Sequence, residues 1–160
     1  MNNDEEGPVY TASQLVTAFS GGDIATLLAS SNSRVEVLEV ELSQITTAPQ
    51  PMSVELFRGT TSVGTGGAAL SVANHDPWSR AAATSVLGQP SAGNSTASAT
   101  RVHAGSIEPD SGKYCFRPDY PMRVSPSQNL HVRTSTSTSS TAGVLTAMAV
   151  RFREIGKMPL

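Results

Sequence analysis

The sequence predicts an all-β fold, an antiparallel β-sandwich or jelly roll of about eight strands with long loops rich in Gly, Ser and Thr. Apolar and polar residues alternate over short segments, and no segment sustains the 3.6-residue period of an amphipathic helix. Turn-forming residues separate these segments. Only 15% of the residues are charged, against about 25% in a typical soluble domain. This composition favours a pleated surface of Ser, Thr, Asn and Gly over helices coated with Lys and Glu.

The length of 160 residues suits one domain, because a chain of this size buries enough surface to fold without a disulfide or a metal. We expect an N-terminal arm at residues 1–9, acidic at its start and either disordered or ordered by a partner. A single sandwich domain is expected at residues 10–156, followed by a C-terminal tail at 157–160.

The first half of the chain holds four segments with strand-like residues, at positions 9–19, 24–29, 34–45 and 52–57. The second of them is short enough to be either a strand or one helical turn. After the fourth, residues 60–69 are rich in Gly and Thr and are predicted to form a long loop.

The third segment changes the phase of its alternation partway along. Val35 and Val37 share one face, but from Leu38 onward the apolar positions are Leu38, Val40 and Leu42. A β-bulge produces such a change, because one extra residue turns every later side chain to the other face. We therefore predict a bulge at Val37–Leu38.

The second half continues with short segments at 70–73 and 83–87 and with strands at 100–107, 113–117, 122–124, 130–133 and 144–153. Residues 81–99 are small and uncharged and predict a second long loop. Residues 134–141 are Ser and Thr only, which predicts either a mobile hairpin tip or a strand with a solvated face. In the last strand one face is formed by Val144, Thr146, Met148, Val150 and Phe152.

Charge is distributed unevenly along the chain. Residues 1–100 carry three basic and nine acidic side chains, a net charge of −6, whereas residues 101–160 carry eight and four, a net charge of +4. If the halves interleave in one sandwich, their strands pair favourably; if they face opposite ways, the molecule is dipolar. Neither pattern is the dense basic stripe of a nucleic-acid-binding protein.

No metal or cofactor site is predicted. Cys115 is the only cysteine, so it forms no intramolecular disulfide, and its aromatic neighbours predict a small buried thiol. His75 and Asp76 are the best start of a metal site, but no other ligands follow at metal-binding spacing. The simpler interpretation of His75-Asp76-Pro77 is an Asx-type turn that orients Trp78.

Catalytic patterns are also incomplete, and we expect no enzyme. Gly59 and Gly64 have the spacing of a phosphate-binding loop, but the lysine that would follow is missing. The chain contains no G-x-S-x-G elbow. Glu39 and Glu41 share a strand face about 7 Å apart, for which a solvated surface is the preferred interpretation.

The N-terminus has neither the basic nor the apolar region of a signal peptide, and no apolar run approaches the ~20 residues needed to cross a bilayer. We therefore expect synthesis in the cytoplasm without secretion, and no membrane partner.

Some residues are candidates for contact with another protein. Trp78 stands near Arg80, and these two residue types are enriched at interface hot spots. A position of Trp78 in the core or beneath a loop is the slightly preferred alternative. The uncharged loops and the acidic arm supply the other candidates. The predicted contact residues are Asp4, Glu5, Glu6, Val9, Tyr10, Thr65, Trp78, Arg80, Gln89 and Asn94.

Five stretches together resemble small virion proteins of tailed bacteriophages and prophages. They lie at residues 34–42, 56–67, 76–82, 122–133 and 152–156. The proteins they resemble are capsid-associated cement or decoration proteins with jelly-roll or related β-sandwich folds. The matching motifs are strand edges and turns, so no functional residue carries over.

The resemblance implies a capsid cement or decoration protein, located on the virion surface. It would bind between major capsid protein subunits as a homo-oligomer, dimer or trimer, and stabilise the phage head. A tail, neck or fibre-associated structural protein is the first alternative. The second is a carbohydrate-binding β-sandwich with Trp78, Tyr114 and Tyr120 as stacking platforms.

Overall fold

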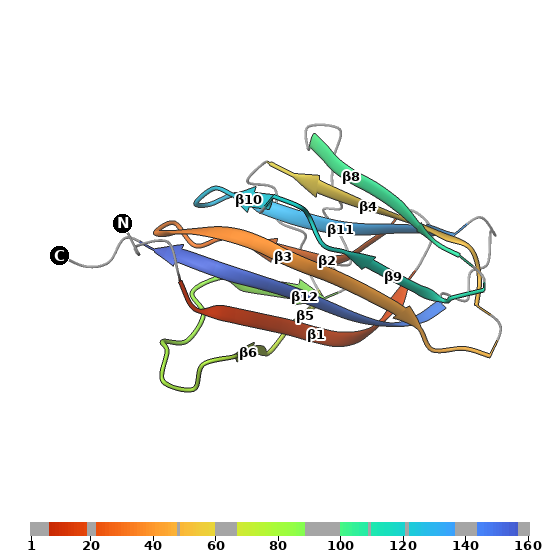
Figure 1. Ribbon diagram of the computed structural model, residues 1–160, viewed down its shortest axis with the longest axis horizontal. Coiled ribbons are helices and arrows are strands. Elements are labelled where there is room, and N and C mark those ends of the chain that lie inside the picture. The colour runs from red at the N-terminus through yellow and green to blue at the C-terminus, as the bar shows by residue number, and fades with distance from the viewer. Residues whose placement is uncertain are drawn as a thin grey trace.

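The computed structural model describes residues 7–18, 22–47, 49–59, 67–88, 100–108, 110–120, 122–136 and 144–156. These residues form two antiparallel sheets that face each other across one hydrophobic core, which confirms the predicted β-sandwich (Figure 1). The described residues form no helix, and hence none long and apolar enough to cross a membrane.

Each sheet contains six strands. Sheet A consists of β1 (Val9–Ala18), β3 (Ser33–Gln44), β6 (Val72–Asn74), β9 (Lys113–Phe116), β10 (Met122–Val124) and β12 (Val144–Gly156). Its order is β10-β3-β12-β1-β6, and β9 also pairs with β3. Sheet B consists of β2 (Gly22–Leu28), β4 (Met52–Arg58), β5 (Ala68–Ala69), β7 (Ser85–Gly88), β8 (Thr100–Ile107) and β11 (Asn129–Thr136). Its order is β5-β7-β2-β11-β4-β8.

The strand order is that of a jelly roll. The first and last strands, β1 and β12, are neighbours in sheet A, and the second and second-last, β2 and β11, are neighbours in sheet B. The next pairs follow the same rule, since β3 lies beside β12 and β4 beside β11. The described strands number twelve and not eight, because one jelly-roll strand is split into β9 and β10 and the segment between β4 and β8 adds β5, β6 and β7.

The added strands extend the sandwich on one side. β6 pairs with β1 in sheet A, whereas β7 and then β5 pair outward from β2 in sheet B. β1 of sheet A also contacts β2 and β7 of sheet B. The edge of sheet A that ends in β6 and the edge of sheet B that ends in β5 therefore lie on the same side of the sandwich (Figure 1). On the opposite side, β8 of sheet B contacts β9 of sheet A.

The predicted bulge lies in β3. Glu39 pairs with Arg151 and Val37 with Phe152, so Leu38 is the extra residue that the pairing with β12 skips. Inward-facing positions therefore continue on both sides of it, and four of them are almost fully buried: Val35, Val37, Val40 and Leu42. The bulge also separates the two short strands that pair with the other side of β3. β10 pairs with β3 up to Val37, and β9 pairs with it from Val40 onward.

The structure decides between the alternatives that the sequence leaves open for residues 24–29. Residues 24–28 lie in β2 and not in a helical turn, because β2 pairs with strands on both sides. Thr134 is 0% exposed within β11, so the Ser- and Thr-rich stretch starts in the protein interior. Residues 137–143 lie outside the described residues.

The last strand confirms its predicted faces. Its inward residues are almost fully buried: Val144, Thr146, Met148, Val150 and Phe152. The Phe152 ring stacks on that of Tyr10, with 5.6 Å between the ring centroids. This contact joins the first and last strands within the core.

Ion pairs join the acidic first half of the chain to its basic second half. Glu36 pairs with Arg123 and Arg153, and Glu39 with Arg117 and Arg151, across neighbouring strands of sheet A. The jelly-roll order interleaves the two halves, so their opposite charges face each other.

The bulge makes a prediction about stability. Leu42→Ala empties a core position that is 1% exposed and should lower the free energy of unfolding by about 2–5 kcal/mol. Leu38→Ala, the same change at the half-buried bulge residue, should cost less than half as much. Urea unfolding monitored by circular dichroism measures both, and equal losses would contradict the observed register.

Candidate functional site

The most exposed large apolar side chain in the described residues is Trp78, at 94%. It lies in the connection between β6 and β7. Its exposure settles the alternative left open by the sequence, because a core tryptophan would be covered by its neighbours. A single exposed apolar residue is common on protein surfaces, but tryptophan is among the residue types most enriched at interface hot spots, so Trp78 is a candidate contact residue.

Hydrogen bonds hold the backbone at Trp78 in a tight turn. The Trp78 amide donates to Asp76 Oδ1 at 3.0 Å, which confirms the predicted Asx-type turn. The Ser79 hydroxyl donates to Asp76 Oδ2 at 2.9 Å, and the Ser79 amide to the Asp76 carbonyl at 3.0 Å. The Asp76 carboxylate thus holds both the backbone of Trp78 and the side chain of Ser79.

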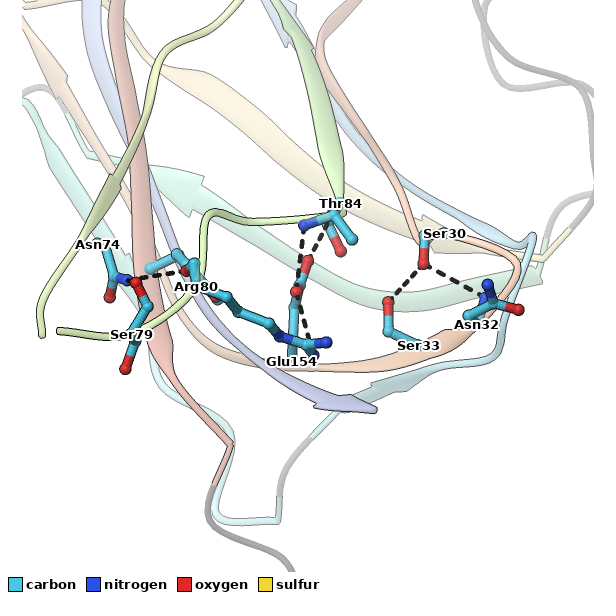
Figure 2. A network of polar contacts seen from close by, with 10 residues as sticks. Ser30, Asn32, Ser33, Asn74, Ser79, Arg80, Thr84 and Glu154 are labelled. Carbon is cyan, nitrogen blue, oxygen red and sulfur yellow. Dashed lines mark hydrogen bonds and ion pairs between the residues drawn. The ribbon is translucent and has the colours of Figure 1, made fainter. Parts of the chain in front are cut away.

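Two side chains attach this turn to the sandwich. Asn74 Nδ2 donates to the carbonyls of Ser79 and Arg80, at 3.2 and 3.0 Å (Figure 2). The Tyr10 hydroxyl donates to the same Arg80 carbonyl at 2.9 Å. We call residues 74–80 the Trp78 turn.

A buried carboxylate fixes the chain just after the turn. Glu154, 0% exposed at the end of β12, accepts hydrogen bonds from the backbone amides of Ala83 and Thr84 (Figure 2). Arg80 Nη2 lies 3.8 Å from Glu154 Oε2. A Cβ on Gly156 would come within 2.8 Å of Arg80 Nη2, so the absence of a side chain there leaves room for the guanidinium.

Sequence reasoning missed Glu154. Its signal was present, because Glu154 stands two residues after Phe152 and so occupies the next inward position of the last strand. A carboxylate there must find donors, since burying an unpaired charge is costly. Burial, followed by the negative charge of Glu154, raises the pKa of Tyr10 above its ordinary value, which keeps the phenol protonated as a donor.

The structure brings the four described contact candidates to one edge of sheet A. The carbonyl of Val9 accepts from the His75 amide at 3.0 Å, so the start of β1 borders the Trp78 turn. Half of the Arg80 side chain is exposed. Tyr10 is 0% exposed, which corrects its assignment as a contact residue: its ring belongs to the core. The remaining candidates lie outside the described residues: Asp4, Glu5, Glu6, Thr65, Gln89 and Asn94.

A second polar cluster lies on the outer face of sheet A, around Cys115. This residue is exposed, which corrects the expected buried thiol: β9 turns Tyr114 inward and Cys115 outward. Sγ lies 3.3 Å from Glu39 Oε1 and 3.9 Å from Glu41 Oε1. The three ligand atoms lie within 4.8 Å of one another, but Arg117 already pairs with both carboxylates, so the cluster is a charge network.

These contacts shift the pKa values of Glu39 and Cys115 in opposite directions. Burial alone raises the pKa of Glu39, but hydrogen bonds from Arg117 and Cys115 outweigh it and hold that pKa below its ordinary value. Burial, together with the hydrogen bond to Glu39 and its charge, raises the pKa of the Cys115 thiol. The thiol therefore stays protonated and is a weak nucleophile despite its exposure.

The three histidines do not converge. His75 Nε2 lies 2.6 Å from Thr11 Oγ1, and the His103 ring lies 4.1 Å from that of Phe116, between centroids. His131 is 1% exposed, and its Nδ1 contacts Asp23 Oδ2 at 3.0 Å. Thr26 Oγ1 approaches that same nitrogen at 3.2 Å. The acid and the hydroxyl therefore share one ring nitrogen, whereas a catalytic relay places them on opposite nitrogens.

The aromatic platform suggested for carbohydrate does not assemble. Tyr114 is 9% exposed, and burial raises its pKa to about 12. Tyr120 is 86% exposed, but it lies between β9 and β10 on the side of sheet A opposite Trp78. The two exposed rings therefore present separate surfaces.

No family model and no curated protein matches the chain. Among solved structures, a chain titled Desmodium yellow mottle tymovirus is similar at 12% identity and a TM-score of 0.27. The match covers 100% of this chain and 93% of that chain. Neither the fold nor the function below rests on this likeness.

Glu154 generates a prediction about the attachment of the Trp78 turn. Glu154→Gln places an amide group where an oxygen now accepts from a backbone amide, and should lower the free energy of unfolding by about 1–3 kcal/mol. Amide hydrogen exchange at Ala83 and Thr84 should accelerate. Glu41→Gln, on a side chain that is 53% exposed, is the control. Unchanged stability and unchanged exchange in Glu154→Gln would show that the carboxylate does not hold this segment.

Glu39 generates a prediction about pH. Because its pKa lies lower in the folded protein than its ordinary value of 4.5, its ionised form contributes stability at neutral pH that is lost as the pH falls below about 4.5. Glu39→Gln should therefore lose less stability than wild type between pH 6 and pH 3, measured by urea unfolding at each pH. Arg117→Gln should flatten the profile in the same direction. Parallel profiles for all three proteins would contradict the assignment.

Proposed function

We propose that this chain is a structural, non-catalytic virion protein of a tailed bacteriophage. In this proposal it is a capsid cement or decoration protein that binds between neighbouring major capsid protein subunits and stabilises the head. Its place is the outer surface of the capsid, in many copies. The Trp78 turn is the part that contacts the capsid subunits.

The observation that carries the proposal is the exposed tryptophan on a rigid support. Trp78 is 94% exposed, yet its backbone is fixed by Asp76 and its turn is held by Asn74. A turn whose backbone is fixed before binding loses little backbone conformational entropy when a partner covers the side chain that it carries. Tryptophan is also among the residues that contribute most to protein interfaces.

The surroundings of Trp78 fit a protein surface as the target. Arg80, the residue with which it shares the turn, keeps about half of its side chain in solvent and is a second typical hot-spot residue. The jelly roll itself is used by viral capsid domains, lectins and cupins. Fold alone does not select among these, so the choice depends on the Trp78 turn and on the sequence resemblance to phage cement proteins.

Shell binding tests the proposal. Wild-type protein should co-sediment with expanded phage shells, raise their thermal stability, and shift the emission of its only tryptophan to shorter wavelength as the indole is covered. Trp78→Ala should bind at least about tenfold more weakly, because burial of a hot-spot tryptophan contributes more than about 1.4 kcal/mol.

The matched control is Tyr120→Ala, which removes another exposed aromatic ring, 86% exposed, from the opposite edge of sheet A. It should bind as wild type does. Binding that Trp78→Ala leaves intact would refute the role of the turn, and no binding by wild type would refute the cement role. Labelling of intact virions separates a head protein from a tail, neck or fibre protein.

A further inference from the structure

The sandwich has four sheet edges, and they differ in length. Sheet A ends in β6, with three residues, and on its other side in β9 and β10, with four and three residues. Sheet B ends in β5, with two residues, and in β8, with eight. Short edge strands limit uncontrolled pairing with other chains. Three edges of the described structure follow that rule, and the β8 edge does not.

Within the described part of the chain, β8 is open on its outer side. It pairs with β4 on its inner side, from Ile107–Met52 to Thr100–Arg58, and no described strand pairs with its other side. Figure 1 shows β8 at the margin of the sandwich. It contains no proline and one formally charged residue, Arg101. One bulge, at Val102, interrupts its pairing with β4.

We propose that the outer edge of β8 pairs with β8 of a second copy of this chain, antiparallel about a two-fold axis near Gly105. A strand that pairs with its own copy in this way forms an isologous contact, in which every pair of facing residues occurs twice, once on each side of the axis. Sheet B of one copy then continues into sheet B of the other. This proposal does not depend on capsid binding.

Charge complementarity supports this register. With Gly105 on the axis, residues that point to the same face lie opposite each other, so His103 faces Ile107 of the second copy. Val102 is the extra residue in β8, as Phe57 pairs with Arg101 and Leu56 with His103. Beyond this bulge, Arg101 comes opposite Glu108 of the second copy, and both residues are exposed.

Both charges remain able to form this contact. Arg101 Nη1 donates to Glu55 Oε1 at 2.7 Å, which leaves other guanidinium N–H groups for a second carboxylate. Glu108 Oε1 accepts from the Ser106 hydroxyl at 2.6 Å, and a carboxylate has further acceptor sites. The two-fold axis would form the Arg101–Glu108 contact twice.

Sedimentation equilibrium of the purified protein over a range of concentrations tests the dimer. Wild type should form a dimer, and Arg101→Glu or Glu108→Arg should each weaken it about tenfold or more, because like charges then face each other at two symmetric positions. The double variant Arg101→Glu/Glu108→Arg restores opposite charges and should recover most of the affinity. Glu55→Gln, which removes only the intrachain partner of Arg101, should dimerise as wild type does.

Hydrogen exchange locates the contact. Amides of residues 101–107 should exchange more slowly at dimer-forming concentrations, whereas those of β10 should not change. A monomer at all concentrations, a double variant no better than either single one, or protection at another edge with none on β8 would each overturn the proposal. Circular dichroism of every variant verifies that it is folded.

Discussion

The carboxylate of Glu154 ties the segment that is added to the jelly roll, between β6 and β7, to the end of β12. The jelly-roll strands are held by their ladders and by the core, but the long segment between β4 and β8 contributes only short strands. Glu154 accepts two backbone amides of that segment from the end of β12. Because the carboxylate is fully buried, these donors are worth more than they would be in water, and losing them would leave the charge with the Arg80 guanidinium, 3.8 Å away, as its remaining described partner. The last strand therefore anchors the chain just after the Trp78 turn, and the turn itself is held by Asp76, Asn74 and Tyr10.

The sequence predicts those strands whose two faces differ in polarity. The last strand and the bulge in β3 are visible because one face is apolar and the other is not, so a change of phase has only one explanation. Tyr10 and Cys115 were misplaced for the opposite reason. Each residue type is tolerated both inside and outside, and only the register of its strand decides its face. For Cys115 that register depends on pairing with β3, which lies more than seventy residues earlier.

Long-range contacts likewise explain why the candidate site was only partly predicted. The Asx-type turn is local, so the residues from His75 to Trp78 were enough to predict it. The support beneath it comes from β1 and β12, at the two ends of the sequence. Long-range contacts also explain how the opposite net charges of the two halves are used. Because the jelly roll places early strands beside late ones, acids of the first half and arginines of the second meet across sheet A.

The positions of the two proposed contact surfaces have a consequence for affinity. The Trp78 turn lies on the side of the sandwich where β6 extends sheet A, and β8 lies on the other side, next to β9. A dimer joined at β8 would therefore carry its two Trp78 turns on its two outer sides, where neither is covered by the dimer contact. Binding of one turn to a repetitive lattice would raise the effective concentration of the second near its own site. Two contacts of modest affinity would then hold the dimer across neighbouring subunits. One exposed tryptophan per chain would be sufficient for stable binding of the dimer.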